Sequence, residues 1–242
     1  MTLATGLRVH PLSPTIGAEI EGIDLSVPLA PETVAAVRQA LNAHHVIFFR
    51  DQSLTPQQQA GFGRQFGEVT EAHPVLPAIA ESPLVLAIDG KVDRASWWHT
   101  DVTFLETPAM GSILYMLEAP DVGGDTMWAS MQDAYDGLAP VVRTHPENGR
   151  NGLFVNGQFT QSLLGLSNNE SNAILEMLYR HCVQPEYTCR FRWQAGSVAF
   201  WDNRATMHYA LDDYGDAPRF AHRVTLRGDR PFGPAVPART DG

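Results

Sequence analysis

Cysteine is scarce in this sequence, as are the other features that most quickly identify a class of protein. The 242 residues include only Cys182 and Cys189, too few for a disulfide framework and not spaced as a metal site. We expect two reduced, mostly buried thiols. The N-terminus lacks a basic segment followed by an apolar one, and no stretch approaches the ~18 apolar residues that would span a bilayer. We therefore expect a cytoplasmic protein with no membrane association.

Basic residues are also few. The 17 Lys and Arg residues face 27 Asp and Glu residues, which gives a net charge of −10 and argues against a nucleic-acid partner. An anionic ligand must then be held by a few specific arginines. With 44% hydrophobic residues, 20 Gly and 17 Pro, the composition fits a globular, turn-rich protein, and we expect residues 1–242 to form one domain.

Three segments carry helix signals, and short β-rich runs fill much of the rest. Apolar residues recur at helical spacing in 31–44, a Thr-Pro capping box predicts a helix over 55–67, and a second capping box starts a helix at Ser167. Strand-like runs occur at 46–49, 111–117, 189–193, 197–201 and 219–227. Short strands with frequent turns predict an all-β core, a sandwich or barrel, with helices flanking its outside.

His99 and Asp101 are the first candidates for chemistry. On a strand, residues two apart point to the same face, so both side chains could reach one metal. A second imidazole would complete a facial triad, which leaves three cis positions for a chelating cosubstrate and O₂. The pair alone is a weak signal, because zinc hydrolases use the same ligand types and a hydrogen-bonded His and Asp at a strand end would look the same.

The third ligand must come from the other histidines of the chain, nine in total. His208 follows the strand-like run at 197–201 among turn formers, where a strand end can present a side chain to a pocket. An ordinary loop histidine would also fit this position.

The segment after His208 places two arginines on one side of a predicted strand. Read with period 2, Arg219, Ala221, Arg223 and Thr225 share a face. A solvated edge strand would give the same pattern, but so would a barrel strand whose polar face lines an anion-binding interior. Because guanidinium groups bind oxyanions through paired hydrogen bonds, two arginines imply two anionic groups.

Taken together, these residues resemble the taurine dioxygenase family of Fe(II)- and 2-oxoglutarate-dependent oxygenases. The strings WHTDVTF, MHYA and PRFAHRVTLRGDRPF match the ligand and arginine motifs of that family. Further similar strings, IGAEIEGIDL, VIFFRDQ, GGDTMWAS, RTHPENG and WDNRATMHYA, extend the resemblance over nearly the whole chain. The resemblance implies a double-stranded β-helix, a jelly-roll or cupin-like fold.

The resemblance also implies the cofactors and the residues that hold them. It makes His99, Asp101 and His208 the ligands of Fe(II), and it assigns Arg219 and Thr126 to the distal carboxylate of the cosubstrate 2-oxoglutarate. O₂ would take the remaining metal position. The implied reaction hydroxylates the carbon next to a sulfonate or sulfate ester and releases sulfite or sulfate, an aldehyde, succinate and CO₂.

Residues of the substrate pocket follow from the same resemblance. Arg223 and His73 would hold the sulfur oxyanion, and Phe159 would line the pocket. Leu76 stands where taurine-oxidising members have a tyrosine, and segment 89–97 lacks an expected asparagine, so polar contacts to a small amine-bearing substrate are lost. A longer alkyl sulfonate or alkyl sulfate is therefore expected at least as much as taurine.

Other interpretations remain open at this point. Within the same family, the substrate could be a carboxylate such as a phenoxyacetate. In other classes, a zinc or manganese hydrolase would leave the two arginines without a role, and a non-catalytic cupin-like binding module would not need an open metal face. We also expect a homo-oligomer, a dimer or a tetramer.

The sequence departs from the family pattern in length. Family members usually carry a few dozen more residues between the equivalents of 133–140 and 141–149, where they form part of a lid. Either this protein lacks the segment, or the sequence omits residues that were disordered in a crystal. We expect the second, because active-site lids are mobile, and a break would separate the Cα atoms of Pro140 and Val141 by far more than ~3.8 Å.

Overall fold

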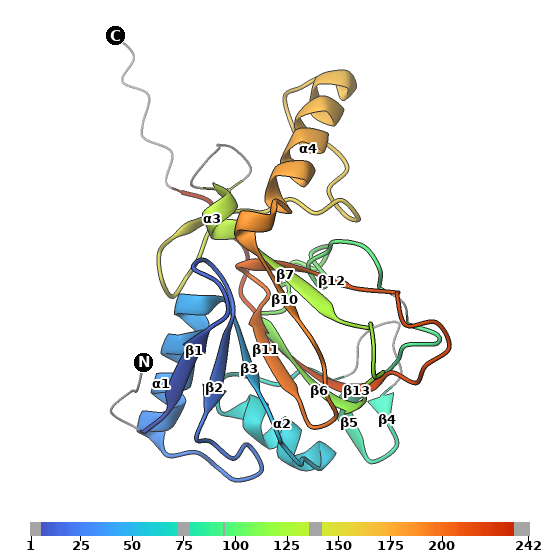
Figure 1. The fold of residues 1–242 in the computed structure, drawn as a ribbon. Coiled ribbons are helices and arrows are strands. Elements are labelled where there is room, and N and C mark those ends of the chain that lie inside the picture. Colours follow the sequence, from blue (N-terminus) through green and yellow to red (C-terminus); the bar gives the residue numbers. More distant parts are fainter. Residues whose placement is uncertain (1–5, 72–77, 94, 136–141, 235–242) are drawn as a thin grey trace.

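Two facing β-sheets form the centre of the molecule (Figure 1). The computed structural model describes residues 6–71, 78–93, 95–135 and 142–234. Among these residues the larger sheet contains, in spatial order, β1 (Arg8–Pro11), β2 (Ala18–Glu21), β3 (Val46–Phe49), β11 (Val198–Asp202), β6 (Gly111–Glu118), β13 (Phe220–Leu226), β5 (Ser82–Asp89) and β4 (Ala78–Ile79). The second sheet has the order β10 (Thr188–Phe191), β7 (Thr126–Ser130) and β12 (Thr206–Ala210), and β8 (Val142–Thr144) pairs with β9 (Asn151–Leu153).

Aromatic side chains fill the space between the two sheets. Phe48 of β3 stacks on Phe191 of β10 with ring centroids 3.8 Å apart, and Trp128 of β7 meets Phe48 edge-on at 5.2 Å. Strand β2 runs parallel to β3, while β11, β6 and β13 pair antiparallel with their neighbours. This arrangement is the predicted all-β core, a double-stranded β-helix of the jelly-roll type.

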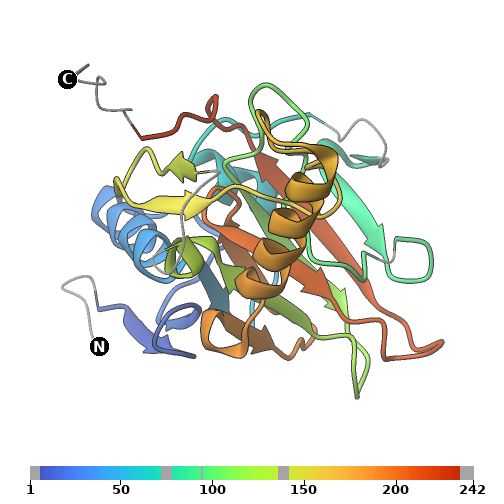
Figure 2. The same cartoon turned by 90° about the horizontal axis from the view of Figure 1, so that it is seen from above.

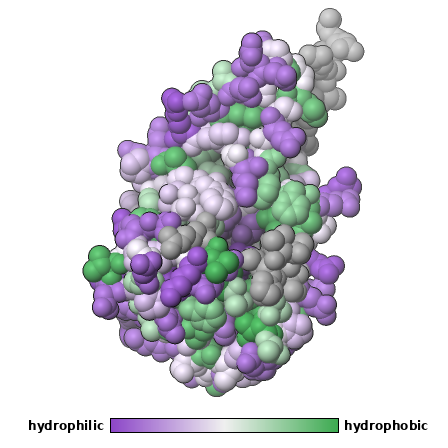
Figure 3. Space-filling view, turned by 90° about the vertical axis from the view of Figure 1, so that its right-hand side faces the viewer, coloured by the Kyte–Doolittle hydropathy of each residue, from purple (hydrophilic) through white to green (hydrophobic). Residues whose placement is uncertain are grey.

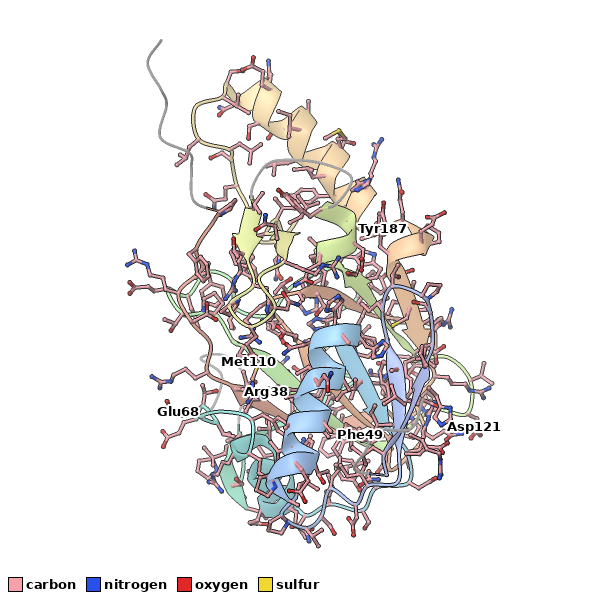
Figure 4. The ribbon with its side chains drawn as sticks, turned by 90° about the vertical axis from the view of Figure 1, so that its left-hand side faces the viewer. Arg38, Phe49, Glu68, Met110, Asp121 and Tyr187 are labelled. Carbon is pink, nitrogen blue, oxygen red and sulfur yellow. The ribbon has the colours of Figure 1, made fainter. Side chains whose placement is uncertain are left out.

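Helices α1 (Pro31–His44) and α2 (Pro56–Arg64) cover the outer face of the larger sheet. Val37 and Leu41 of α1 join Phe49 and Phe200 in a buried apolar cluster. Figure 4 shows α1 lying across this face with Arg38 on it. The sheet is thus buried on both sides, which holds its central strands firmly in place.

Helices α3 (Met131–Tyr135) and α4 (Asn168–Cys182), with a 3₁₀ turn at Pro185–Tyr187, lie near the second sheet. They share a third apolar cluster with β9, in which Leu175 and Leu178 of α4 are buried. Helix α4 projects from the body in Figure 1 and crosses in front of the sheets when seen from above in Figure 2.

Local sequence signals located the helices well. Helix α1 has the predicted bounds, and the capping boxes at Thr55 and Ser167 are both formed. Helix α2 ends at Arg64 and not at Gly67, because the next two backbone N–H groups bond three residues back and tighten the last turn. The predicted strands are also present, with ends shifted by one or two residues.

The predictions for the cysteines and the surface can also be compared with the structure. Both thiols are buried, and burial raises the pKa of Cys182 and of Cys189 to about 12, so neither is a reactive thiolate at neutral pH. Within the described ranges, no helix combines the length and apolar character needed to traverse a bilayer. Figure 3 shows one face of the molecule, on which hydrophilic and hydrophobic side chains are intermixed.

Candidate metal centre and active site

The three residues predicted to bind a metal lie together at β12, the strand that contains His208. The ligand atoms of His99, Asp101 and His208 are all within 4.8 Å of one another, and all three residues are buried. The Nε2 atoms of His99 and His208 lie 3.8 and 3.9 Å from Oδ1 of Asp101. Cis ligands around a metal are about 3 Å apart, so small side-chain movements would close the three groups around an ion. Two imidazoles and one carboxylate are the donor set of a facial-triad iron site.

The backbone around His99 differs from the predicted strand. A single bridge joins His99 to His208, with N–H···O distances of 3.0 and 2.8 Å in the two directions. Asp101 then lies in a turn, and Val102 has φ of +48°, a left-handed conformation that β-branched residues rarely adopt. The prediction that His99 and Asp101 share one face of a single strand is therefore wrong, and the turn brings the carboxylate to the imidazoles instead.

The ring of His99 is oriented for metal binding. Its Nδ1 lies 2.9 Å from the carbonyl oxygen of Trp97. A carbonyl oxygen can only accept, so Nδ1 carries the proton and donates it. The Nε2 atom, which faces Asp101, is then left with its lone pair, as a metal ligand requires.

Charges around the carboxylate keep Asp101 ionised. Burial alone would raise its pKa, but the Arg223 guanidinium, together with His208 and His99 when these are protonated, outweighs this effect and holds the pKa well below its usual range. Burial lowers the pKa of His208 to about 3. At neutral pH the site therefore presents an anionic carboxylate and a neutral imidazole, which are the protonation states that bind metals.

Two polar residues that carried no prediction hold Asp101 in place. Ser112 Oγ of β6 donates to Oδ2 of Asp101 at 3.2 Å. The carboxamide of Asn203, in the loop between β11 and β12, bonds to the Asp101 backbone. Asn203 belongs to the familial string WDNRATMHYA, which is the one signal in the sequence that could have pointed to it.

Arg219 and Thr126, both assigned to the cosubstrate, lie side by side in the structure. Arg219 Nη2 donates to Thr126 Oγ1 at 3.3 Å, and Arg219 Nε donates to the carbonyl of Gly124 at 3.0 Å. Trp193 also donates to Thr126 Oγ1, at 2.9 Å. Both residues are buried. The pair forms a small, desolvated cationic site suited to one carboxylate.

Arg223, four residues further along, lies against the metal ligands. Its Nη1 donates to Oδ1 of Asp101 at 3.1 Å, an ion pair that the sequence did not predict. Its Nε is buried and has no hydrogen-bond partner among the described residues. The guanidinium thus has donor capacity left for an anion beside the carboxylate.

A cavity of about 300 Å³ extends from Asp101 and Arg223. Leu84 and Leu86 of β5 line one side, and Leu86 is the cross-strand partner of Arg223. Val102 and Leu105, from the turn after Asp101, line it as well. The cavity therefore combines a cationic group beside the metal ligands with apolar walls.

Of the two further predicted substrate residues, Phe159 does not line this cavity and His73 cannot be compared with it. Phe159 packs edge-on against Phe104 at 5.1 Å and lines a smaller cavity of about 100 Å³ together with Thr100 and Asn203. His73 lies outside the described residues, as do Leu76 and the junction of Pro140 with Val141.

A buried His-Asp-His site on a double-stranded β-helix, with Arg223 on β13 and Arg219 one residue before that strand, is the architecture of a mononuclear non-haem metal oxygenase. The family model described as taurine catabolism dioxygenase TauD, TfdA family, matches residues 8–140 and 137–225. The chain belongs to this family. It is an Fe(II)- and 2-oxoglutarate-dependent dioxygenase, which excludes the hydrolase and binding-module interpretations.

Similar proteins match this chain over most of their length. The chain is 39% identical to an alpha-ketoglutarate-dependent sulfate ester dioxygenase from Pseudomonas putida, over 95% of this chain and 92% of that protein. It is 35% identical to an alkylsulfatase from Acinetobacter baylyi, over 92% of this chain and 86% of the relative. A crystal structure of a taurine dioxygenase from Burkholderia xenovorans superposes with a TM-score of 0.89 at 42% identity, covering 94% and 91% of the two chains.

Proposed function

We propose that this dioxygenase oxidises an alkyl sulfate ester or an alkyl sulfonate, with release of sulfate or sulfite, an aldehyde, succinate and CO₂. The observation that carries the proposal is the cavity at Asp101 and Arg223, in which a buried guanidinium adjoins an apolar part of the wall formed by leucine and valine side chains. A sulfur oxyanion matches the guanidinium, and an alkyl chain matches the walls. The names of the two relatives, a sulfate ester dioxygenase and an alkylsulfatase, support the same class of substrate.

Separate residues of the site are proposed to bind the metal, the cosubstrate and the substrate anion. His99, Asp101 and His208 hold Fe(II), which when bound supplies the redox chemistry that activates O₂. Arg219 and Thr126 hold the distal carboxylate of 2-oxoglutarate.

Arg223 orients the substrate. Its guanidinium, 3.1 Å from the Asp101 carboxylate, holds the sulfur oxyanion, so the neighbouring carbon lies beside the metal ligands. Leu84, Leu86 and Leu105 enclose the alkyl chain and exclude water from it. His73 and Phe159 are proposed as further pocket residues on the family resemblance alone.

The test is succinate release with taurine, alkanesulfonates, alkyl sulfates and phenoxyacetates, with the organic product identified by mass. Turnover of alkyl sulfates or alkanesulfonates, with release of sulfate or sulfite, is the expected result. Turnover of a phenoxyacetate alone would make the sulfur-oxyanion role of Arg223 wrong while leaving the iron site intact. Taurine as the only substrate would contradict the role of the apolar walls.

The remaining proposals concern the chain as a whole. We propose a cytoplasmic homo-oligomer, a dimer or a tetramer, in which residues 1–242 form a single domain and the sequence omits a lid segment near 140/141. The family model matches in two segments that meet at 137–140, which supports a missing segment at this point. Size-exclusion chromatography with light scattering tests the oligomeric state, and mass spectrometry of the expressed full-length gene product tests the missing segment.

A further inference from the structure

Asn203 holds the main chain of Asp101 through its carboxamide. Oδ1 of Asn203 accepts the Asp101 N–H at 3.1 Å, and Nδ2 donates to the carbonyls of Asp101 at 2.9 Å and Ala109 at 3.3 Å. The residue is only 2% exposed. Because the N–H needs an acceptor and both carbonyls need a donor, only one orientation of the amide satisfies all three groups.

Among the described residues, no strand pairs with the backbone of Asp101. The bridge to His208 ends at His99, Asp101 lies in a turn, and Val102 is in the left-handed region. A backbone in this conformation persists only where its surroundings determine it. In a β-ladder, a residue exchanges its N–H and its carbonyl with one partner across the strand. The carboxamide of Asn203 provides both bonds to Asp101 and so replaces that partner.

Asn203 is itself anchored from the side away from the metal site. The neighbouring Asp202 carboxylate accepts from His145 Nε2 at 3.0 Å and from Arg204 Nη2 at 2.7 Å. Arg204 also pairs with Glu147 at 2.8 Å. Asp202, Arg204 and His145 are buried, and a buried network whose members are paired is rigid. These bonds hold the turn that contains Asn203 in one conformation.

We propose that Asn203 is a positioning residue for the metal site. It fixes the backbone of Asp101 so that the carboxylate meets the two imidazoles. This inference rests on the proposed assignment of His99, Asp101 and His208 as the metal ligands. Groups that orient metal ligands from outside typically contribute about 10- to 100-fold in metal affinity, so the effect is measurable without turnover.

The experiment titrates the metal-free enzyme with Co(II) and follows the dissociation constant and the visible spectrum. Asn203→Ala is expected to raise the Kd for Co(II) by about 10- to 100-fold and to change the spectrum of the bound ion. Gln59→Ala is the matched control. Gln59 is also a buried carboxamide that donates to two backbone carbonyls, those of Ile113 and His222, at 3.0 and 3.1 Å. It contacts none of the ligands, so it is expected to lower Tm comparably and to leave the Kd unchanged.

The outcomes separate a positioning role from a merely structural one. A wild-type Kd in Asn203→Ala overturns the proposal, and so does an equal weakening in Gln59→Ala. Asn203→Ser is measured in parallel in case Asn203→Ala does not fold, because serine keeps one hydroxyl donor at this position. A wild-type Kd for Co(II) in Asn203→Ser would also overturn the proposal. Wild-type Co(II) binding by Asp101→Ala would instead refute the ligand assignment itself.

Discussion

Buried His45 makes the stability of this fold depend on pH. The residue is 1% exposed, and its Nε2 has no hydrogen-bond partner in the described part of the chain. Burial lowers the pKa of His45 to about 4, from an ordinary value of 6.5. As the pH falls below 6.5, His45 becomes protonated in the unfolded chain, whereas in the folded chain it stays neutral until about pH 4. The stability contributed by the neutral ring is therefore complete above pH 6.5 and is lost as the pH falls toward 4.

The magnitude follows from the two pKa values. Between pH 7 and pH 5, His45 alone should reduce the free energy of unfolding by about 2 kcal/mol, a large part of the roughly 5–15 kcal/mol of a typical domain. His45 caps α1 with φ of +63°, a conformation that asparagine tolerates. His45→Asn should therefore keep the backbone and lose this part of the pH dependence. Other histidines, His208 included, contribute equally to both proteins and cancel in the comparison.

The assay is urea unfolding of the metal-free protein at pH 7 and pH 5. The wild-type protein is expected to lose about 2 kcal/mol more than His45→Asn over this interval. His10→Asn serves as the control, because the His10 side chain is 50% exposed and its removal should leave the wild-type pH dependence in place. Equal losses in the wild-type protein and His45→Asn would refute the reasoning.

The remaining predictions concern the active site. Asp101→Ala should abolish iron-dependent succinate formation, and retained turnover would contradict the triad. Arg219→Met should raise KM for 2-oxoglutarate by roughly 10- to 100-fold, since hydrogen bonds to charged groups contribute about 1.5–3 kcal/mol, whereas an unchanged KM would place the cosubstrate elsewhere. Arg223→Met should raise KM for the sulfur substrate by a similar factor of roughly tenfold or more, measured at saturating 2-oxoglutarate. Leu105→Trp should reduce kcat/KM for octyl sulfate more than for ethyl sulfate, and equal reductions would exclude Leu105 from the wall that contacts the chain.

Features encoded by neighbouring residues were predictable from the sequence. The capping boxes at Thr55 and Ser167 join residues three apart, and both form as expected. The alternation along β13 also holds, because Arg223 and Thr225 line the cavity while Val224 is buried against the helices. In each case the residues that form the sequence pattern also make the contacts, so the pattern alone was enough to predict them.

Contacts between distant segments were not predictable in this way. Arg223 and Asp101 are 122 residues apart, and only the folded sheet brings them to 3.1 Å. Ser112 and Asn203 reach Asp101 from two further elements. The prediction of a strand at His99 and Asp101 was wrong for the same reason. A single bridge to the distant His208 and the left-handed conformation of Val102 determine the path of the chain there. The family motifs thus sufficed to propose the three ligands, which the fold brings together, but the contacts that hold Asp101 could not be predicted.

Strand β13 lines the cavity with one face and packs into the core with the other, which limits how its sequence can change to accept other substrates. Arg223 and Thr225 line the cavity, whereas Val224 and Leu226 are packed beneath the helices. Substitutions on this strand therefore risk the fold along with the chemistry. Leu105 is 40% exposed and Leu84 is only partly buried, so substitutions at these two positions disturb the packing of the core less. We expect the evolution or engineering of new substrate ranges to proceed through the turn after Asp101 and through strand β5, while β13 stays constant.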